Sequence, residues 1–378
     1  MKKTLNVGLV GLGYIGKIHA ISYRDTALCF NEPQVTANLK AVLRTSLGRD
    51  KEFLQTAGIQ LETTSLEEFF AQPLDLVDVC SPSAMHTTYV VEAARRGIPV
   101  YCEKPLGKDL ADAHFMAGAA AQAGILTHMA FTLRYLPAIR QMKAILDSGE
   151  LGEVFTFRGN IFHSSYLDPQ RPMSWRLRFS QSGGGAMADL GAHVVDLVKY
   201  LIGDAAAVGA KTRTFIQERP LKRGSAETGT VDVDDWALCT LELNNGAIGH
   251  IEASRMAAGI GDDIGLQVFC RKGSVHFNAG NPHEVRFHEL KTGRWLSGSL
   301  PYPEICGERP IASIYPSGKF SQGRFMDSHL ASCYDFLQCV QQGTPSRSDF
   351  QSALAVQEIL EAAYTSARTT GEMLSLPL

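Results

Sequence analysis

The feature that most constrains the fold is a glycine-rich turn between an apolar segment and a helical one. Residues 4–10 are almost wholly apolar, as in a short strand, and residues 14–25 have helical spacing. The turn between them reads Gly11-Leu12-Gly13-Tyr14-Ile15-Gly16. In this setting the first glycine permits a tight turn, the second lets a phosphate approach, and the third allows close helix–strand packing. The pattern predicts a dinucleotide site that includes Gly11, Gly13, Tyr14, Ile15 and Gly16.

Apolar strands and helical segments alternate through the first third of the chain. Further strands are expected at residues 38–44, 74–80, 98–103 and 125–131. Apolar strands that are separated by helices indicate a parallel sheet covered on both faces. The sequence therefore predicts an α/β domain of the Rossmann type, with a doubly wound parallel sheet.

The pattern changes after about residue 135, where hairpins replace the alternation of strands and helices. Turns are expected at Asn244-Asn245-Gly246 and at Lys272-Gly273, between neighbouring strands. Consecutive hairpins indicate an α+β domain with an open mixed sheet, mostly antiparallel. We therefore expect a dinucleotide-binding domain at 1–132 and a second domain at 133–378.

Composition excludes several classes of function. The chain has 378 residues, 20% of them charged, and a formal net charge of -3 without a concentrated basic patch, which is not typical of a nucleic-acid binder. No apolar run approaches the ~18 residues of a membrane span, and the run after the two N-terminal lysines leads into the glycine turn and not into a signal peptide. We expect a cytoplasmic protein without nucleic-acid or membrane partners.

The cysteines point to neither disulfides nor a metal. They are scattered, and none forms a CxxC pair: Cys29, Cys80, Cys102, Cys239, Cys270, Cys306, Cys333 and Cys339. Several lie in apolar, strand-like runs, so reduced and buried thiols are expected. No cysteine–histidine group has the spacing of metal ligands, and no metal is expected.

The end of the second expected strand bears on the choice of dinucleotide. An NAD site normally has an Asp or Glu there for the ribose hydroxyls of adenosine, whereas this sequence has Arg44, Thr45, Ser46 and Arg49. A guanidinium pairs with a 2′-phosphate and hydroxyl groups donate to it, so NADP is mildly favoured. In the alternative, Arg44 stacks on adenine and NAD is used as well. Because Arg44 lies more than the usual ~20 residues after the glycine turn, residues 26–38 are expected to be an insertion.

Polar residues follow two further strands of the expected sheet. Ser81-Pro82-Ser83 ends the third strand, with His86 just inside the next helix, and Glu103-Lys104-Pro105 ends the fourth. The carboxyl ends of parallel strands line one crevice on the ligand side of such a sheet. We therefore expect these residues beside the cofactor.

Another motif lies in the second half of the chain. Gly183-Gly184-Gly185 leads into Asp189 and His193, which are four residues apart and share a face of an expected helix at 189–202. A carboxylate beside an imidazole orients the ring and supports its charged form, as acid–base catalysis needs. In the alternatives, Asp189 is the N-cap of this helix and His193 is a packed core residue.

Together these motifs resemble those of the glucose–fructose oxidoreductase, inositol dehydrogenase and rhizopine-catabolism (Gfo/Idh/MocA) family over nearly the whole chain. They are GLGYIG at 11–16, the Ser-Pro segment with His86, Glu-Lys-Pro at 103–105, FTLRYLP at 131–137 and GGG…DLGAHVVD at 183–196. The resemblance implies a Rossmann domain and a second domain whose open sheet carries substrate on one face and often subunit contacts on the other. It implies catalytic roles for Lys104, Asp189 and His193, a Lys104–Pro105 bond that is often cis, and a homodimer or homotetramer.

The implied activity is that of an NAD(P)-dependent oxidoreductase, which transfers a hydride between nicotinamide and a hydroxyl or carbonyl carbon of a sugar, inositol or related polyol. We expect His193 to accept the hydroxyl proton while Lys104 stabilises the charge on the same oxygen, or the reverse. Asp189 is expected to orient His193 or to bind a neighbouring hydroxyl.

Further residues are assigned by their place in these motifs. Arg134 is expected at the cofactor and Tyr135 at the substrate. The segment after residue 161 resembles the substrate-proximal loop of sugar- and inositol-oxidising relatives, and its candidate contacts are His163, Tyr166, Trp175 and Arg176; the alternative is a plain surface loop. Two other functions stay open, namely an NAD-dependent glycoside hydrolase of the same fold and a non-catalytic nucleotide-sensing regulator.

Overall fold

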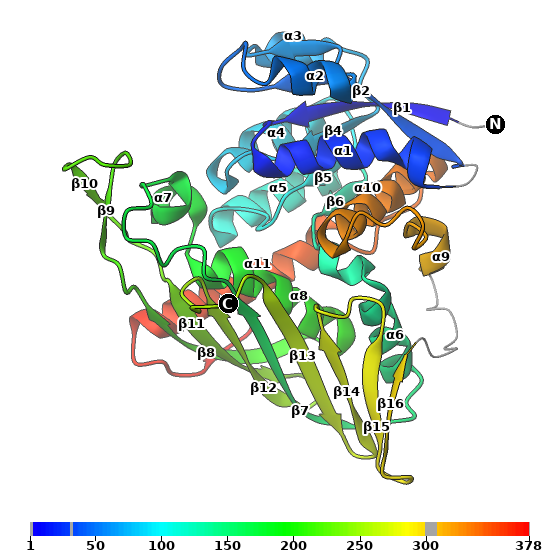
Figure 1. Cartoon of the computed structure of the whole chain (residues 1–378), viewed down its shortest axis with the longest axis vertical. Coiled ribbons are helices and arrows are strands. Elements are labelled where there is room, and N and C mark those ends of the chain that lie inside the picture. The colour runs from blue at the N-terminus through cyan, green and yellow to red at the C-terminus, as the bar shows by residue number, and fades with distance from the viewer. Residues whose placement is uncertain (1–2, 31–32, 299–307, 378) are drawn as a thin grey trace. The chain divides into compact units, whose positions relative to one another are not determined.

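The computed structural model describes residues 3–30, 33–298 and 308–377. Contacts divide the chain into two compact units. The first consists of Met1–Gly107, Ala111–Tyr135 and Gly307–Leu354, and the second of Lys108–Leu110, Leu136–Cys306 and Ala355–Leu378. Each unit is built on a sheet of its own (Figure 1).

The first unit contains the parallel sheet that the sequence predicts. Six strands run in the order β3-β2-β1-β4-β5-β6, and all pairs are parallel. The strands are β1 Lys3–Val10, β2 Val35–Leu43, β3 Leu61–Thr63, β4 Leu76–Val79, β5 Val100–Cys102 and β6 Thr127–Met129. The order reverses between β1 and β4, and doubly wound sheets bind ligands at the carboxyl ends of such strands.

Helices connect these strands. They are α1 Tyr14–Cys29, α2 Lys51–Ala57, α3 Leu66–Phe70, η1 Ser83–Met85, α4 His86–Arg95, α5 Leu110–Ala123 and η2 Thr132–Tyr135. Because α1 links β1 to β2 and α4 links β4 to β5 in the opposite direction, right-handed crossovers place these two helices on opposite faces. The doubly wound prediction is confirmed.

The expected insertion at residues 26–38 is wrong. Thr26 and Cys29 complete the last turn of α1, and Val35 already belongs to β2. Thr26 and Cys29 at this end of α1 are buried. The helix contacts α10, Arg324–Gln342, and Phe30 stacks on Tyr334 with ring centroids 4.1 Å apart. A long helix, and not an inserted segment, accounts for the spacing.

The last part of the first unit comes from far along the chain. It contains α9, Ile311–Ile314, and α10. Tyr334, Phe336 and Leu337 of α10 share one hydrophobic core with Leu5 of β1 and Tyr23 of α1. Residues 307–354 therefore pack in the first unit, whereas the expected boundary assigns them to the second domain. They do so because α1 and β2 cover the apolar face of α10. The assignment of residues 1–132 to cofactor binding and of residues 133–378 to substrate binding stays a prediction.

The second unit contains the mixed sheet. Its nine strands run in the order β16-β15-β14-β13-β7-β12-β11-β8-β17, and every pair is antiparallel except β7 with β12. They are β7 Val154–Phe162, β8 Ala205–Arg213, β11 Trp236–Leu243, β12 Ile248–Ser254, β13 Asp263–Cys270, β14 Gly273–Asn278, β15 Val285–Glu289, β16 Arg294–Gly298 and β17 Leu374–Ser375. β9 Glu218–Pro220 and β10 Thr228–Thr230 form a separate ribbon. The two predicted hairpins are confirmed as β11–β12 and β13–β14.

Two helices pack on this sheet. α6, Pro137–Asp147, contacts β14 and β15, and α8, Ala192–Leu201, contacts β7. A Cβ at Gly159 would lie 2.5 Å from Val194 Cγ1, so this glycine lets α8 approach β7 closely. The other helices are η3 Trp175–Leu177, α7 Phe179–Ser182, η4 Met187–Gly191 and α11 Phe350–Arg368. Each helix in the described ranges is too short or too polar to cross a bilayer.

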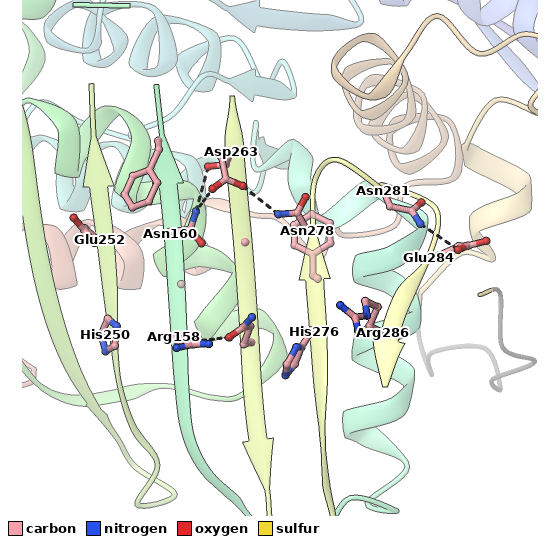
Figure 2. Close-up of a pocket in the computed structure, with 15 residues that line it drawn as sticks. Arg158, Asn160, His250, Glu252, Asp263, His276, Asn278, Asn281, Glu284 and Arg286 are labelled. Atoms are coloured by element: carbon pink, nitrogen blue, oxygen red, sulfur yellow. Dashed lines mark hydrogen bonds between the residues drawn. The ribbon is translucent and has the colours of Figure 1, made fainter. Parts of the chain in front are cut away.

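The other face of the nine-stranded sheet is polar (Figure 2). On β7, buried Phe157 and Ile161 alternate with Arg158 and Asn160. A hollow of about 620 Å³ lies on the polar face, and its lining includes Arg158, Asn160, His250, Glu252, His276 and Arg286. Arg158 donates to Gln267 of β13 within it. We call this surface the polar sheet face.

Candidate active site

The glycine turn has the geometry that a dinucleotide phosphate needs. Gly11 has a φ of +91°, and a Cβ on it would lie 2.9 Å from Cys80 O. A Cβ on Gly16 would lie 2.2 Å from Gly11 O, so close packing excludes a side chain here. At Gly13, the N-cap of α1, an added Cβ would meet no described atom within 4 Å. This open space, beside the N–H groups that start α1, fits a bound phosphate.

Arg44 follows β2, where the adenosine ribose is expected, but its guanidinium is engaged by two carboxylates. Nη2 lies 3.1 Å from Asp50 Oδ2, and Nη1 lies 3.1 Å from Glu62 Oε1. Nη1 also donates to the Arg49 carbonyl at 3.1 Å. Acidic groups at this place repel a 2′-phosphate, so the contacts of Arg44 count against a strong preference for NADP. The neighbouring candidates Thr45, Ser46 and Arg49 are exposed or half-buried.

His86 joins two loops at the carboxyl edge of the parallel sheet. Its ring is buried, with Nδ1 3.0 Å from Leu106 O and Nε2 2.9 Å from Ser81 O. Burial lowers the pKa of His86, which favours the neutral ring. Ser81 and Pro82 are half-buried and Ser83 is buried. The contacts of His86 shape the turn after β4, and its own contact with a cofactor stays a prediction.

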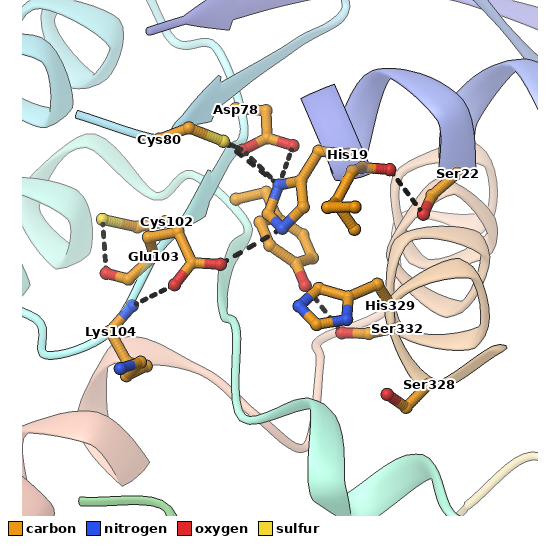
Figure 3. Close-up of polar contacts among 12 residues, drawn as sticks. His19, Ser22, Asp78, Cys80, Cys102, Glu103, Lys104, Ser328, His329 and Ser332 are labelled. Atoms are coloured by element: carbon orange, nitrogen blue, oxygen red, sulfur yellow. Dashed lines mark hydrogen bonds and ion pairs between the residues drawn. The ribbon is translucent and has the colours of Figure 1, made fainter. Parts of the chain in front are cut away.

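A buried network of charged residues connects α1, β4 and the loop after β5 (Figure 3). His19 Nδ1 lies 2.9 Å from Asp78 Oδ2, and His19 Nε2 forms an ion pair with Glu103 Oε1 at 3.1 Å. Cys80 Sγ lies 3.2 Å from the same Nδ1. The backbone N–H of Lys104 donates to Glu103 Oε2 at 3.2 Å. The network therefore links the helix of the glycine turn to the residue that is expected to act on substrate.

The electrostatics of this network stabilise an imidazolium. Burial alone would lower the pKa of His19, but Asp78 and Glu103 raise it to about 10. Burial would raise the pKa of Glu103, but His19 and then Lys104 lower it to about 2. His329 of α10 lies 5.6 Å from His19 between ring centroids, and burial with the His19 charge lowers its pKa to about 4. Near neutral pH, His19 and Glu103 are therefore charged and His329 is neutral.

The same side chains also have the donor atoms of a metal site. His19, Asp78 and Cys80 offer ligand atoms within 4.8 Å of one another, and so do His19, Glu103 and His329. Histidine binds metal in its neutral form. Since His19 is held as an imidazolium between two carboxylates, an ion-pair network accounts for the cluster. The expectation that the protein needs no metal stays a prediction.

Arg134 and Tyr135 of η2 are buried and make contacts within the first unit. Arg134 donates to Arg347 O and to Ser352 Oγ, both at 2.8 Å. Tyr135 Oη donates to Asp335 Oδ2 of α10 at 2.9 Å. These contacts hold η2 in place, and the roles of the two residues at cofactor and substrate stay predictions.

In the second unit, the glycines before the candidate carboxylate allow close packing. A Cβ on Gly184 would lie 2.3 Å from Tyr364 Oη, and one on Gly185 would lie 2.0 Å from Asp234 O. The Asp234 carboxylate accepts the N–H groups of Gly185 and Met187 at 2.8 and 2.9 Å, and the hydroxyl of Tyr364 at 2.8 Å. Asp234 therefore caps η4, a π-helical turn of the kind that is frequent at functional sites.

Asp189 and His193 lie on this helical segment. Asp189 is inside η4, whose N-cap is Ala186, and His193 is in the first turn of α8. The helix expected at 189–202 is confirmed, and Asp189 is not its N-cap. Both residues are half-buried. Asp189 Oδ2 lies 3.0 Å from Nη2 of Arg255, a buried residue that directly follows β12.

The expected substrate loop contains an aromatic ring covered by cations. The guanidinium carbons of Arg171, Arg255 and Arg219 lie 4.1, 4.7 and 5.7 Å from the ring centroid of Tyr166. Tyr166 is itself buried, so its faces are engaged by protein. His163 Nε2 lies 3.3 Å from Asp262 Oδ1, and Arg176 lies over the Trp175 ring at 4.4 Å. Substrate contacts from these residues stay predictions.

The expected catalytic residues are shared between the two units. Lys104 is in the first unit and half-buried, and its bond to Pro105 is cis, as the resemblance implies. Asp189 and His193 are in the second unit. The combination of all three in one site stays a prediction.

Sequence reasoning missed His19, Asp78, Asp234 and Arg255. One signal was available, because Asp78 is a charged residue in a wholly buried strand, and such a group needs a partner. The ion pair of Arg255 joins residues 66 positions apart and has no local signature.

Seven of the eight cysteines lie in the described ranges. All seven are free and buried, as expected: Cys29, Cys80, Cys102, Cys239, Cys270, Cys333 and Cys339. Cys306 lies outside the described residues. Burial raises the pKa of the Cys80 thiol, which keeps it protonated.

Comparison with known proteins covers both units. Residues 5–131 match an oxidoreductase family with an NAD-binding Rossmann fold, and residues 139–276 match the GFO/IDH/MocA C-terminal domain. The levoglucosan dehydrogenase of Pseudarthrobacter phenanthrenivorans is 29% identical over 96% of this chain and 96% of its own. The myo-inositol 2-dehydrogenase of Thermotoga maritima is 26% identical over 90% of each chain.

Solved structures agree with this similarity. The structure of levoglucosan dehydrogenase in complex with NADH and L-sorbose has a TM-score of 0.90 at 28% identity, and the match covers 99% of both chains. The complex of that enzyme with NADH and levoglucosan has a TM-score of 0.89 at 27% identity and covers 99% of this chain and 100% of that one. The chain thus belongs to the Gfo/Idh/MocA family, and it is a nicotinamide-dependent oxidoreductase that acts on CH–OH groups.

Proposed function

We propose that the substrate is a sugar, an anhydrosugar or an inositol, oxidised at a secondary hydroxyl or reduced at the matching carbonyl. The observation that carries this proposal is similarity to a levoglucosan dehydrogenase over 96% of the chain, together with an Asp189–His193 pair on one helical segment. The polar and aromatic side chains of the 163–176 segment suit a hydroxyl-rich ligand, which needs both hydrogen bonds and apolar contact.

Each candidate residue has a distinct role in this proposal. The glycine turn holds the pyrophosphate, and the bound nicotinamide supplies the hydride acceptor or donor. A ring nitrogen of His193 takes the hydroxyl proton during oxidation and returns it during reduction. Lys104 Nζ donates a hydrogen bond to the same oxygen and stabilises its developing charge. Asp189 supports the charged form of His193 or accepts a neighbouring hydroxyl.

A substrate panel tests the proposal. Levoglucosan, free sugars, inositols and their keto forms are assayed with NAD and NADP and followed through the absorbance of the reduced cofactor at about 340 nm. We expect turnover of at least one polyol. Cleavage of a glycoside without net cofactor reduction supports the hydrolase alternative. Tight cofactor binding without turnover of any compound supports the regulator.

The catalytic assignment has its own test. Lys104→Ala and His193→Ala are each expected to lower kcat at least ~100-fold, because each removes a group that acts on the reacting oxygen. Lys199→Ala is the control, since Lys199 is on the same helix as His193 and pairs with Asp204 at 2.9 Å. Near-normal turnover in both active-site variants contradicts the assignment.

The cofactor is the second open choice. The sequence mildly favours NADP, but the two carboxylates on Arg44 favour NAD, and we propose NAD as the working cofactor. We expect calorimetry to give a lower Kd for NAD than for NADP. Glu62→Gln, which frees one side of the Arg44 guanidinium, is expected to move the ratio of the two Kd values toward NADP. Tighter binding of NADP by the wild type contradicts this choice.

Assembly and location complete the proposal. The polar sheet face is proposed as the contact between subunits of a homodimer or homotetramer, as the resemblance implies. The cytoplasm is the proposed location, which the free thiols of the seven described cysteines support.

A further inference from the structure

We infer that Arg255 is the positioning residue that holds Asp189 as a fixed carboxylate and connects it to the substrate loop. The inference rests on the proposed role of Asp189 and adds a residue that no sequence motif marks. It concerns contacts within the second unit alone.

The backbone of Arg255 anchors the loop. β7 and β12 are parallel neighbours, so their carboxyl ends lie at the same edge of the sheet. The N–H of His163 donates to Ser254 O at 2.8 Å, and the N–H of Tyr166 donates to Arg255 O at 3.2 Å. Arg255 N–H in turn donates to Asp235 O at 2.9 Å. Backbone hydrogen bonds therefore fix the start of the substrate loop to Ser254 and Arg255.

The side chain of Arg255 makes one ion pair and one ring contact. It is 1% exposed, and its Nη2 lies 3.0 Å from Asp189 Oδ2. The guanidinium carbon lies 4.7 Å from the centroid of the Tyr166 ring. Within the described ranges, Nε and Nη1 are buried without a hydrogen-bond acceptor. The Asp189 carboxylate is thus the anion to which this buried cation is bound.

The ion pair with Asp189 favours the charged form of Arg255. Burial alone would lower the pKa of Arg255, but Asp189, Tyr166 and Asp234 raise it above its ordinary value. Arg219 is also buried and also lies over Tyr166, but it donates to the carbonyls of Tyr166 and Asp168, and burial lowers its pKa. Arg219 is therefore a matched arginine without the link to Asp189.

A guanidinium at hydrogen-bond distance favours the charged form of a carboxylate and restricts its rotation. Asp189 consequently acts as a fixed negative charge, and proton transfer belongs to His193. Because Arg255 also contacts Tyr166, a movement of the substrate loop is expected to alter the position of Asp189 through the Arg255 side chain.

Kinetics give the first test. With the most active polyol of the panel, Arg255→Met is expected to lower kcat at least about tenfold with a smaller change in KM, and Arg255→Lys to restore part of it. Arg219→Met is the comparison, because it disturbs the same loop without a link to Asp189, and it is expected to raise KM more than it lowers kcat. No loss of kcat in Arg255→Met, or an effect on KM alone, overturns the inference.

A double-mutant cycle separates positioning from general damage. If Arg255 acts through Asp189, Arg255→Met lowers kcat far less in an Asp189→Asn background than in the wild type. Independent, multiplying losses overturn the inference. Full activity of Asp189→Asn alone instead contradicts the proposed function, so the two failures are distinguishable.

A readout without turnover keeps the inference testable if no substrate is found or a variant is inactive. The pKa of His193 is followed by NMR of histidine-labelled protein and assigned with His193→Asn. Arg255→Met is expected to shift this pKa by at least about half a unit with Asp189 present and not in an Asp189→Asn background, and Arg219→Met to leave it unchanged. An unchanged pKa of His193 in Arg255→Met, or an equal shift in the Asp189→Asn background, overturns the inference.

Discussion

At the scale of single residues, the three glycines of the turn have different reasons to lack a side chain. Packing of the protein itself excludes a Cβ at Gly11 and Gly16, whereas Gly13 faces open space. Its φ of -74° is also one that alanine adopts readily. The fold itself therefore does not require a glycine at position 13, as is expected where the backbone faces a bound phosphate.

Gly13→Ala tests this distinction. We expect its free energy of unfolding in urea to stay within about 0.5 kcal/mol of the wild type. The Kd for NAD, from calorimetry, is expected to rise at least about tenfold, because the methyl group occupies the approach of the phosphate. Gly16→Ala is the contrasting variant, with an expected loss of more than about 2 kcal/mol. An unchanged Kd in Gly13→Ala contradicts the assigned phosphate site.

At the scale of elements, the segment that carries Asp189 is held from its N-terminal end by one carboxylate. Asp234 accepts three donors from the glycine block, from η4 and from α11. The close packing of Gly184 and Gly185 places those donors within reach. The position of Asp189 therefore depends on a residue that lies 45 positions later in the sequence.

Asp234→Ala is expected to lower the free energy of unfolding by about 3 kcal/mol, since it leaves buried donors unsatisfied. It is also expected to lower kcat, because η4 loses its cap. Asp232→Ala is the control, because Asp232 accepts a single N–H, that of Phe179, at an exposed position. Urea unfolding measures both, and equal losses contradict the capping role of Asp234.

At the scale of the whole molecule, the buried histidines set the pH range of stability. The pKa of His19 is raised from 6.5 to about 10, so its contribution is full below about pH 6.5 and is lost as pH rises through 10. Glu103, lowered from 4.5 to about 2, contributes above pH 4.5 and loses its contribution as pH falls toward 2. His329, lowered from 6.5 to about 4, contributes nothing above pH 6.5 and destabilises the fold as pH falls from 6.5 toward 4. Stability is therefore expected to be greatest near pH 6.5.

His19→Asn isolates the alkaline part of this dependence. Between pH 6.5 and about pH 9.5, the wild type is expected to lose on the order of 3 kcal/mol more unfolding free energy than the variant. Urea unfolding at the two pH values gives the difference. If His19→Asn does not fold, Glu103→Gln reports the same linkage, because it removes one of the two carboxylates that raise the pKa of His19. Parallel pH dependence in wild type and variant contradicts the network.

The polar sheet face gives a second prediction at this scale. We expect light scattering to show a dimer or tetramer, and Arg158→Glu to shift it toward monomer, because the change reverses a charge on the proposed subunit contact. Arg95→Glu is the control, since Arg95 is an exposed residue of α4 in the first unit. A monomeric wild type, or an equal effect of both variants, contradicts the proposed contact.

What the sequence by itself determined is local. The glycine turn, the alternation of strands and helices, and both hairpins depend on residues within a few positions of one another, so periodicity and turn chemistry predict them. The motifs also marked Lys104, Asp189 and His193, because their spacing and neighbours are distinctive. The inserted segment was wrong because a distance along the chain does not show how long a helix continues.

The tertiary structure alone decided the partners of those residues. Arg44 is paired with Glu62 of β3, His19 with Asp78 and Glu103, Asp189 with Arg255, and α10 with α1. These contacts join residues far apart in sequence, where no repeat or spacing records them. A charged side chain in a buried segment shows that a partner is needed, but the fold determines which residue is that partner. The partner in turn determines the charge state and the orientation of each group in the site.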